Sequence, residues 1–239
     1  MTGVQTCALP ISCPSHHSTQ LFNHLPLPSK MGYFDFGAFE LLKDKMSSST
    51  AILAGPGMGV ADSVKVLMKD IIRGSNVPLI IDADGLNVIS TDVDVLKLAS
   101  CPIIITPHIG EFARLIHRPC NEILKNKRDF ASEFAKEFGS IVILKSHETI
   151  VACPDGEIFE NALGNPGMAT GGSGDVLSGA IASFAAQGCS PLLSSLAGVF
   201  FHSLSGDMAA NELGEYSLIA GDIINYLAYA IKETGEKIN

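Results

Sequence analysis

The sequence predicts an α/β fold of three layers, in which helices cover both faces of a mostly parallel sheet. Short runs of Ile, Val and Leu recur along the chain, and stretches with helical spacing of apolar residues separate them. Such continuous apolar runs are typical of parallel strands, which are buried on both faces. Glycine-rich or acidic loops follow several of these runs, and in sheets of this kind ligands bind beyond the carboxyl ends of the strands.

The predicted elements alternate along the chain in the order that a parallel sheet requires. Strands, each a short run rich in Ile, Val, Leu or Ala, are expected at 51–55, 78–84, 102–107 and 141–145. A hairpin is expected at 149–159, because a Pro-Asp-Gly turn lies within it. Helices, with apolar residues three and four apart, are expected at 34–46, 60–73, 93–99, 109–116, 122–139, 175–187, 192–213 and 221–233.

The composition limits the classes of protein to which the chain can belong. The chain has 239 residues, of which 46% are hydrophobic, and this suits one domain with a large core. A net charge of −9 argues against nucleic acid or an anionic membrane as the partner. No apolar run reaches the ~18 residues of a membrane-spanning helix. The six cysteines show neither a CxxC pair nor metal-ligand spacing, which indicates free thiols in a reducing, cytoplasmic compartment.

The first residues differ in composition from the rest of the chain. Residues 1–13 lack the basic start and the apolar run of a signal peptide. They resemble the translation of a sequencing-library adapter, so this tail is expected to be non-native and to make few contacts with the fold. A natural terminal tail is the alternative. Residues 14–239 are then expected to form a single domain that is incomplete at its N-terminus.

The most informative stretch is GNPGMATGGSGDVLSG at 164–179, which places six glycines around one acid, Asp175. An apolar helical pattern follows directly, so the glycines precede a helix N-terminus. There the free backbone N–H groups and the positive end of the helix dipole favour an anion. The residues by themselves leave two roles open for Asp175, a helix cap or a general base beside the anion.

Three other segments precede this stretch in a fixed order: GPGMG at 55–59, DADGLN at 82–87 and TPHIGEFARL at 106–115. Together with the glycine-rich stretch they resemble the ADP/ATP-dependent NAD(P)H-hydrate dehydratases, the carboxy-terminal YjeF-type domain of the ribokinase-like superfamily. The resemblance covers roughly residues 30–235. It implies a ribokinase-like fold that lacks its first strand and helix in this chain.

The resemblance implies a repair lyase. Its substrate is the S epimer of hydrated NADH or NADPH (NADHX or NADPHX), and ADP or ATP with Mg²⁺ drives the dehydration. The implied route is kinase-like, since the ring hydroxyl takes a phosphoryl group and phosphate leaves as the double bond re-forms. A homotetramer, and an epimerase as a fused domain or separate partner, are also implied. Two alternatives remain, a small-molecule kinase of the hydroxyethylthiazole or pyridoxal type and an inactive nucleotide-binding fragment.

The resemblance also assigns roles to residues. Asp175 is implied to contact the hydrate and to deprotonate its attacking hydroxyl, while the N–H groups of Gly172–Gly174 hold the transferring phosphoryl group. Gly57 and His108 match residues that contact the hydrate. The implied nucleotide-binding residues are Lys145, Ser146, His147, Glu148, Thr149, Gly172 and Gly174.

Structural alternatives stand beside the roles of the polar residues. His108 is either a ligand contact or a helix N-terminal residue, and Glu111 either completes a cap or helps to order Mg²⁺. Asp84, together with Asp82 and Asn87, either binds Mg²⁺ through water or caps the next helix.

Structural alternatives also exist for the roles of Gly57, Lys145 and Ser146. Gly57 can serve turn geometry as well as the hydrate. Lys145 is otherwise a solvated charge at a strand end. Ser146 stands where glycine is commoner in the family, so nucleotide placement depends on whether serine tolerates the backbone conformation there.

Overall fold

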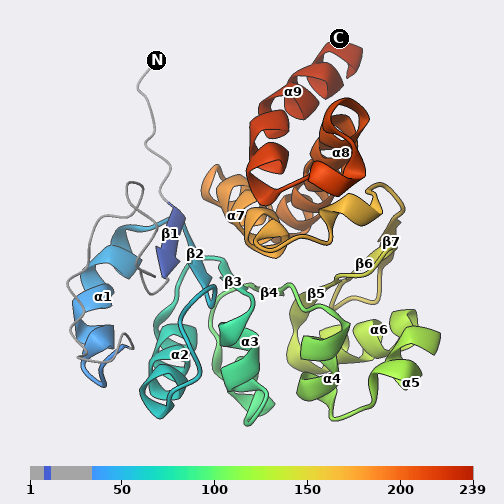
Figure 1. Ribbon diagram of the computed structural model, residues 1–239. Helices are drawn as coiled ribbons and strands as arrows, with labels where there is room; N and C mark the ends of the chain where they lie inside the picture. Colours follow the sequence, from blue (N-terminus) through green and yellow to red (C-terminus); the bar gives the residue numbers. More distant parts are fainter. Residues whose placement is uncertain (1–7, 12–33, 239) are drawn as a thin grey trace.

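The computed structural model describes residues 8–11 and 34–238 of the chain (Figure 1). Within these residues the strands form one seven-stranded sheet whose spatial order follows the sequence. The first five strands are parallel, and the last two are antiparallel. The strands are β1 Ala8–Ile11, β2 Ala51–Ala54, β3 Leu79–Ile81, β4 Ile103–Ile105, β5 Ser140–Leu144, β6 Thr149–Ala152 and β7 Ile158–Asn161.

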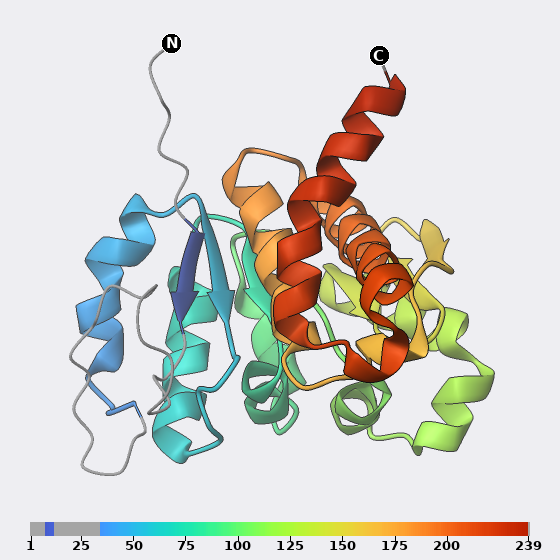
Figure 2. The same ribbon diagram turned by 45° about the horizontal axis from the view of Figure 1, so that its top comes forward.

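The helices form two layers, one on each face of the sheet (Figures 1 and 2). The first layer holds α1 Ala38–Ser48, α2 Asp62–Gly74, α3 Asp84–Ile89, the 3₁₀ helix η1 Val93–Leu98, α4 Ile109–Ile116, α5 Cys120–Lys125 and α6 Lys127–Phe138. The second holds α7 Ser173–Ala186, α8 Pro191–Leu213 and α9 Ala220–Ile238, with two short 3₁₀ turns, η2 Pro166–Met168 and η3 Glu215–Ser217. No helix in the described ranges is long and apolar enough to cross a membrane.

Successive side chains along each central strand pack alternately against the two helix layers. On β3, Leu79 and Ile81 belong to the core shared with α1 to α6, whereas Ile80 belongs to the core shared with α7 and α8. Successive side chains of a strand point to opposite faces, so a strand covered on both sides must be apolar throughout. Every residue of β2, β3, β4 and β5 is buried, which confirms the predicted three-layer α/β class.

Three helix predictions need correction. The expected helix 122–139 is two helices, because Asn126 leaves the helical region at φ −134° between α5 and α6. The expected helix 93–99 is the 3₁₀ helix η1. The strand expected at 78–84 ends at Ile81, and Asp84 begins the unpredicted six-residue helix α3, which is too short to show a helical period.

The first residues also depart from expectation. Ala8–Ile11 form the edge strand β1, which pairs in parallel with β2 from Ala8 opposite Ala51 to Ile11 opposite Ala54. The expectation that residues 1–13 make few contacts with the fold is therefore wrong for this strand. The rest of that tail lies outside the described residues, and its non-native origin stays a prediction.

Two glycines, Gly55 and Gly85, let the segment after β2 lie directly against the segment after β3. Gly55 has φ +130°, and a Cβ added to it would lie 1.8 Å from the carbonyl oxygen of Asp82. A Cβ added to Gly85 would lie 3.0 Å from the Ala54 oxygen and the Gly55 Cα. Side chains at either position would push the GPGMG loop away from the start of α3.

We expect Gly55→Ala to lower the free energy of unfolding by more than about 2 kcal/mol, because it combines a left-handed φ with a backbone clash. Urea unfolding of both proteins measures this. Gly179→Ala in α7 is the matched control, since its Cβ meets no atom within 4 Å and alanine favours the helix by up to about 1 kcal/mol. Equal stability of Gly55→Ala and the parent protein would contradict the close-approach argument.

Candidate functional site

The loops that the sequence singled out lie at one edge of the sheet. GPGMG follows β2, DADGLN follows β3, TPHIGE follows β4 and KSHET follows β5, and these four strands are parallel neighbours. Parallel strands end at the same edge, so the four loops are adjacent. The glycine-rich stretch reaches them from the opposite helix layer, because α7 packs on β2 and β3 through Leu177 and Ile181.

Hydrogen bonds join these loops to one another. The Gly59 N–H donates to Asp84 Oδ2 at 2.8 Å, which ties GPGMG to the start of α3. The Lys145 N–H donates to the Pro107 carbonyl oxygen at 2.8 Å, so His108 and Lys145 form an isolated parallel bridge. The backbone itself therefore holds the hydrate-contact candidate His108 beside the nucleotide candidate Lys145.

A buried ion pair lies beneath these loops. Lys145 Nζ is 2.9 Å from Asp82 Oδ1, and Asp82 is only 1% exposed. Asp82 Oδ1 also accepts from the Ala83 N–H at 2.8 Å, while Asp82 Oδ2 has no hydrogen-bond partner in the described part of the chain. Asp82 does not cap α3, whose N-cap residue is Ala83, and magnesium binding through water by Asp82 stays a prediction. The alternative of Lys145 as a solvated charge is likewise wrong, since burial forces the two charges to pair.

The N-terminus of α7 lies directly over this ion pair. Gly172 is the N-cap residue at φ +86°, and Ser173, Gly174 and Asp175 form the first helical turn. A Cβ added to Gly174 would lie 3.2 Å from Lys145 Nζ and 4.0 Å from Asp82 Oδ2. The first N–H groups of a helix have no intrahelical partner, so this turn brings free donors to the cationic end of Lys145.

Asp175 is not the helix cap, because Gly172 occupies that position and no side chain caps it. Within the described residues its carboxylate makes no hydrogen bond or ion pair that would give it a structural role. Partial burial, and then the charge of Asp82, raise the pKa of the Asp175 carboxyl, whereas Lys145 lowers it. Asp84 and Glu111 also raise this pKa, which places both of those acids near Asp175.

His108 and Glu111 form the capping box of α4. His108 Nδ1 accepts from the N–H groups of Gly110 at 2.9 Å and Glu111 at 3.3 Å, and Glu111 Oε2 accepts from the His108 N–H at 2.8 Å. Glu111 is buried, while the imidazole of His108 is half exposed. Their capping roles are therefore confirmed, and ligand contact by His108 and magnesium binding by Glu111 stay predictions.

The acids at this edge suit a hydrated Mg²⁺ better than an ion bound directly by several protein ligands. Among the described residues no three His, Cys, Asp or Glu side chains gather as a metal-binding group. Asn87 is used elsewhere, since its Oδ1 accepts from Arg114 Nε at 3.0 Å. Mg²⁺ usually keeps several waters and binds one or two carboxylates plus substrate phosphates, so Asp84 and Glu111 fit as outer contacts.

The KSHET segment forms a closed turn before β6. Lys127 Nζ donates to Ser146 Oγ at 3.2 Å, and the Ser146 hydroxyl donates to the Glu148 carbonyl oxygen. Thr149 Oγ1 donates to the Ser146 carbonyl oxygen at 3.3 Å. Ser146 is not among the described residues with positive φ, so serine fits this turn without strain. Nucleotide contact by Ser146, His147, Glu148 and Thr149 stays a prediction.

Sequence reasoning missed the part that α8 plays. The segment 192–213 was predicted only as a helix, but His202 is buried within it with Nε2 3.0 Å from the Ser173 carbonyl oxygen. Asp207 accepts from the Gly164 N–H at 2.9 Å and from Asn165 Nδ2 at 2.9 Å. Two polar residues within an apolar helix were the available signal, because buried polar groups need partners.

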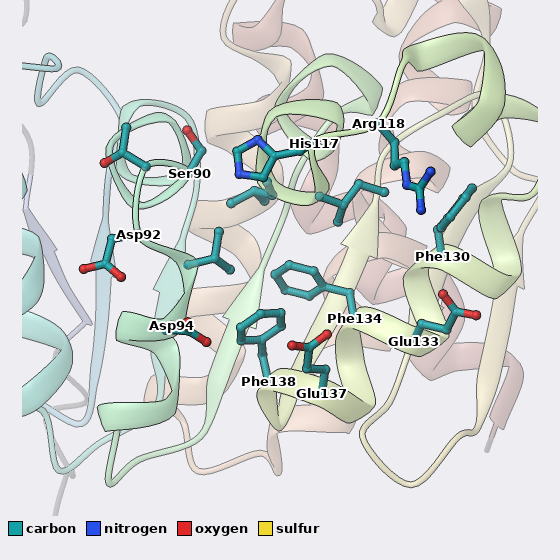
Figure 3. A pocket seen from close by; sticks show the side chains of 14 residues that line it. Ser90, Asp92, Asp94, His117, Arg118, Phe130, Glu133, Phe134, Glu137 and Phe138 are labelled. Carbon is teal, nitrogen blue, oxygen red and sulfur yellow. The ribbon is translucent and has the colours of Figure 1, made fainter.

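A hollow of about 570 Å³ lies elsewhere, near the C-terminal ends of α3 and α4 (Figure 3). Its lining includes Asp92, His117, Arg118 and Phe134, and none of the candidate catalytic, substrate-binding, nucleotide-binding or metal residues. The chain enters α3 and α4 at the carboxyl edge of the sheet, so their other ends lie away from it. This hollow is therefore separate from the edge that gathers Asp82, Lys145 and Asp175.

Comparison with known proteins decides the family. The sequence profile of the NAD(P)H-hydrate dehydratase family matches residues 11–228. The chain belongs to the NAD(P)H-hydrate dehydratase family. The ordered motifs at the sheet edge are therefore those of a dehydratase domain, and the predicted family is confirmed.

Individual relatives agree. The bifunctional NAD(P)H-hydrate repair enzyme Nnr of Moorella thermoacetica is 36% identical over 201 residues, which are 84% of this chain and 38% of that protein. The ADP-dependent (S)-NAD(P)H-hydrate dehydratase of Neisseria meningitidis serogroup B is 37% identical over 183 residues, 75% of this chain and 62% of that protein. The chain thus spans less than two thirds of the length of both.

A solved structure of the family has the same fold. The ADP/ATP-dependent NAD(P)H-hydrate dehydratase from Bacillus subtilis, co-crystallised with ATP and Mg²⁺, matches with a TM-score of 0.70 and 30% identity. The match covers 77% of this chain and 64% of that one. The ribokinase-like dehydratase fold predicted from the motifs is therefore confirmed.

The buried imidazole gives the dehydratase domain an acid-sensitive stability. Burial lowers the pKa of His202 to about 4, against about 6.5 in the unfolded chain. Between these values the unfolded state binds a proton that the folded state does not, so stability is complete above pH 6.5 and falls as the pH drops. We expect His202 alone to cost about 2 kcal/mol between pH 7 and pH 5.

Urea unfolding at both pH values measures this cost. His202→Gln removes the titrating group and keeps an amide donor, so its stability should depend less on pH than that of the parent protein by the same amount. Parallel pH dependence in the two proteins would show that His202 titrates normally in the folded state.

Proposed function

We propose that this chain dehydrates the S epimer of NADHX or NADPHX to NADH or NADPH, with ADP or ATP as the phosphoryl donor. The observation that carries the proposal is the meeting of Asp175, Lys145 and the first turn of α7 at one sheet edge. A carboxylate without a structural bond, a cation and free backbone donors are the groups that phosphoryl transfer to a hydroxyl requires.

Asp175 acts as the general base in this proposal. Its carboxylate takes the proton of the ring hydroxyl while that oxygen attacks the terminal phosphorus of the nucleotide. Partial burial, and then the charge of Asp82, raise the pKa of the Asp175 carboxyl, which strengthens it as a base, and Lys145 opposes this shift.

The first turn of α7 stabilises the transferring group. The N–H groups of Gly172, Ser173 and Gly174 lie where negative charge develops on the phosphoryl oxygens, and the helix dipole acts in the same direction. In the second step the phosphate leaves with the electrons of its C–O bond, and the adjacent ring carbon loses a proton as the double bond re-forms. Asp84 and Glu111 would hold a hydrated Mg²⁺ beside the phosphates, and the ion would neutralise part of their charge.

His108 and Gly57 border the hydrate in this arrangement. His108 Nδ1 is an acceptor in the capping box, so a ring proton is carried on Nε2, which lies 3.5 Å from Glu111 Oε1. The imidazole is half exposed, and its open face can contact the carboxamide or hydroxyl of the substrate. Gly57 has φ +68° and is exposed, which leaves backbone open beside it. The segment 145–149 borders the nucleotide.

Further proposals concern an epimerase partner, the oligomeric state and an alternative activity. The Moorella relative is named a bifunctional repair enzyme, which supports an epimerase as a fused or separate partner. Exposed apolar side chains on α8 and α9, including Leu213, Ile224 and Tyr229, support a homo-oligomer, and by resemblance a homotetramer in the cytoplasm. A small-molecule kinase is the alternative, and a lasting phosphorylated product would identify it.

Asp175→Asn tests the base. Asparagine keeps the shape but cannot accept the proton, so turnover of NADPHX with ADP and Mg²⁺ should fall on the order of 10²–10⁴-fold. Nucleotide affinity, measured by calorimetry, should hold or improve because a negative charge leaves the site. Recovery of absorbance at 340 nm, a wavelength at which the restored dihydronicotinamide absorbs, follows the reaction.

Asp44→Asn is the matched control, because Asp44 is exposed on α1, which leads into the opposite end of β2. Near-normal turnover of Asp175→Asn would reject the general-base role. An inactive parent protein that still binds ADP would instead support the inactive-fragment alternative.

Glu111→Gln separates the cap from the metal role. The amide oxygen of glutamine can still accept from the His108 N–H, so stability should change by less than about 1 kcal/mol. If Glu111 orders Mg²⁺, the Mg²⁺ concentration for half-maximal turnover should rise several-fold, since a charge is lost. An unchanged Mg²⁺ titration with unchanged stability would leave Glu111 as a cap alone.

A further inference from the structure

His202 of α8 makes a contact that packing alone does not require. The imidazole is 8% exposed, and Nε2 lies 3.0 Å from the Ser173 carbonyl oxygen and 3.3 Å from Ser173 Oγ. A carbonyl oxygen can only accept, so Nε2 carries the proton and donates. The ring is neutral at pH 7 because burial lowers the pKa of His202 to about 4. A helix in one segment of the chain thus bonds the first turn of another.

The accepting oxygen and one anion donor belong to the same rigid unit. The carbonyl of Ser173 and the N–H of Gly174 are the two ends of one planar trans peptide group, so they point in opposite directions. A bond that holds the oxygen toward α8 therefore holds the Gly174 N–H on the other side. First-turn N–H groups point out of the N-terminal end of a helix, and Gly174 lies against the ion pair there, since a Cβ at Gly174 would lie 3.2 Å from Lys145 Nζ.

We propose that His202 is a positioning residue that orients the Ser173–Gly174 peptide, so that the Gly174 N–H donates to a phosphoryl oxygen at the α7 N-terminus. The inference rests on the proposed phosphoryl transfer and names a residue on which its geometry depends. Gly172 and Gly174 flank Ser173, and glycine leaves a backbone more freedom than any other residue. The Ser173–Gly174 peptide is the first of α7, where the N–H has no intrahelical partner, so the bond from His202 adds to the helix in fixing its orientation.

The rest of the glycine-rich stretch is held from the same helix. Asp207 accepts from the Gly164 N–H, and Asn165 Nδ2 donates to the Gly206 carbonyl oxygen at 3.1 Å. A Cβ at Gly206 would lie 2.3 Å from Met168 Sδ, so the stretch lies directly on α8 there. Gly206 and Asp207 of α8 therefore hold the stretch at 164–165, and His202 holds it at Ser173.

The experiment compares three variants of the full chain. His202→Leu removes the donor at similar volume, and His202→Gln restores an N–H donor near the position of Nε2. Val199→Ala is the matched control, because Val199 is buried on α8 but its side chain cannot donate a hydrogen bond. If His202→Leu does not fold, His202→Met takes its place as the variant without a donor.

The first readout needs no catalysis. A hydrogen bond to the Ser173 carbonyl deshields the Gly174 amide nitrogen, so the ¹⁵N resonance of Gly174 in the free protein should move upfield in His202→Leu. It should stay in place in Val199→Ala and return in His202→Gln. Titration with ADP and Mg²⁺ should shift the Gly174 amide proton downfield in the parent protein and clearly less in His202→Leu.

The second readout is the split between kcat and KM. In His202→Leu we expect kcat to fall on the order of 10- to 100-fold, less than the ~10²–10³-fold loss of an oxyanion donor, with KM for the hydrate nearly unchanged. His202→Gln should recover most of kcat. Val199→Ala should lose stability without this loss of kcat.

An unmoved Gly174 resonance in His202→Leu, or equal loss of kcat in Val199→Ala and His202→Leu, would overturn the inference. A parent protein that does not dehydrate the substrate would refute the proposed function. The resonance in the free protein and its response to ADP would still decide the role of His202.

Discussion

The buried pair of Asp82 and Lys145 is the contact on which the arrangement of this edge depends. Asp82 follows β3 and Lys145 follows β5, so their bond crosses the end of β4 and ties three strands together. A buried ion pair contributes little net stability, but removing one partner leaves a buried charge that costs several kcal/mol. The pair therefore restricts where the loops and the α7 N-terminus can lie, and the neighbouring glycines supply the close approach.

The sheet topology explains how residues far apart in sequence meet there. Strands β1 to β5 run in parallel in sequence order, so each successive loop lies beside the one before it. The first helix layer leaves this edge strand by strand, whereas the stretch 164–175 arrives after the hairpin β6–β7 has reversed the chain direction. One layer thus contributes Asp84 and the capping box of His108, and the other contributes Asp175.

Much of this could be predicted from the sequence. Apolar runs located β2 to β5, and the motifs located the loops after them, because burial on both faces and glycine-rich turns leave local signals. The break at Asn126 and the short helix α3 left none. The Asp82–Lys145 bond, 63 residues apart in sequence, and the contact of His202 with Ser173 depend on tertiary packing. A polar residue within an apolar helix suggests a buried partner, but only the fold identifies it.

Lys145 acts on two acids at this edge, Asp82 and Asp175. Partial burial is the main cause that raises the pKa of the Asp175 carboxyl, and the charges of Asp82, Asp84 and Glu111 raise it further. Lys145 opposes this shift at Asp175 and also compensates the buried charge of Asp82. Backbone donors at the α7 N-terminus carry no proton that Asp175 can take, and they can bind phosphate without competing for its role.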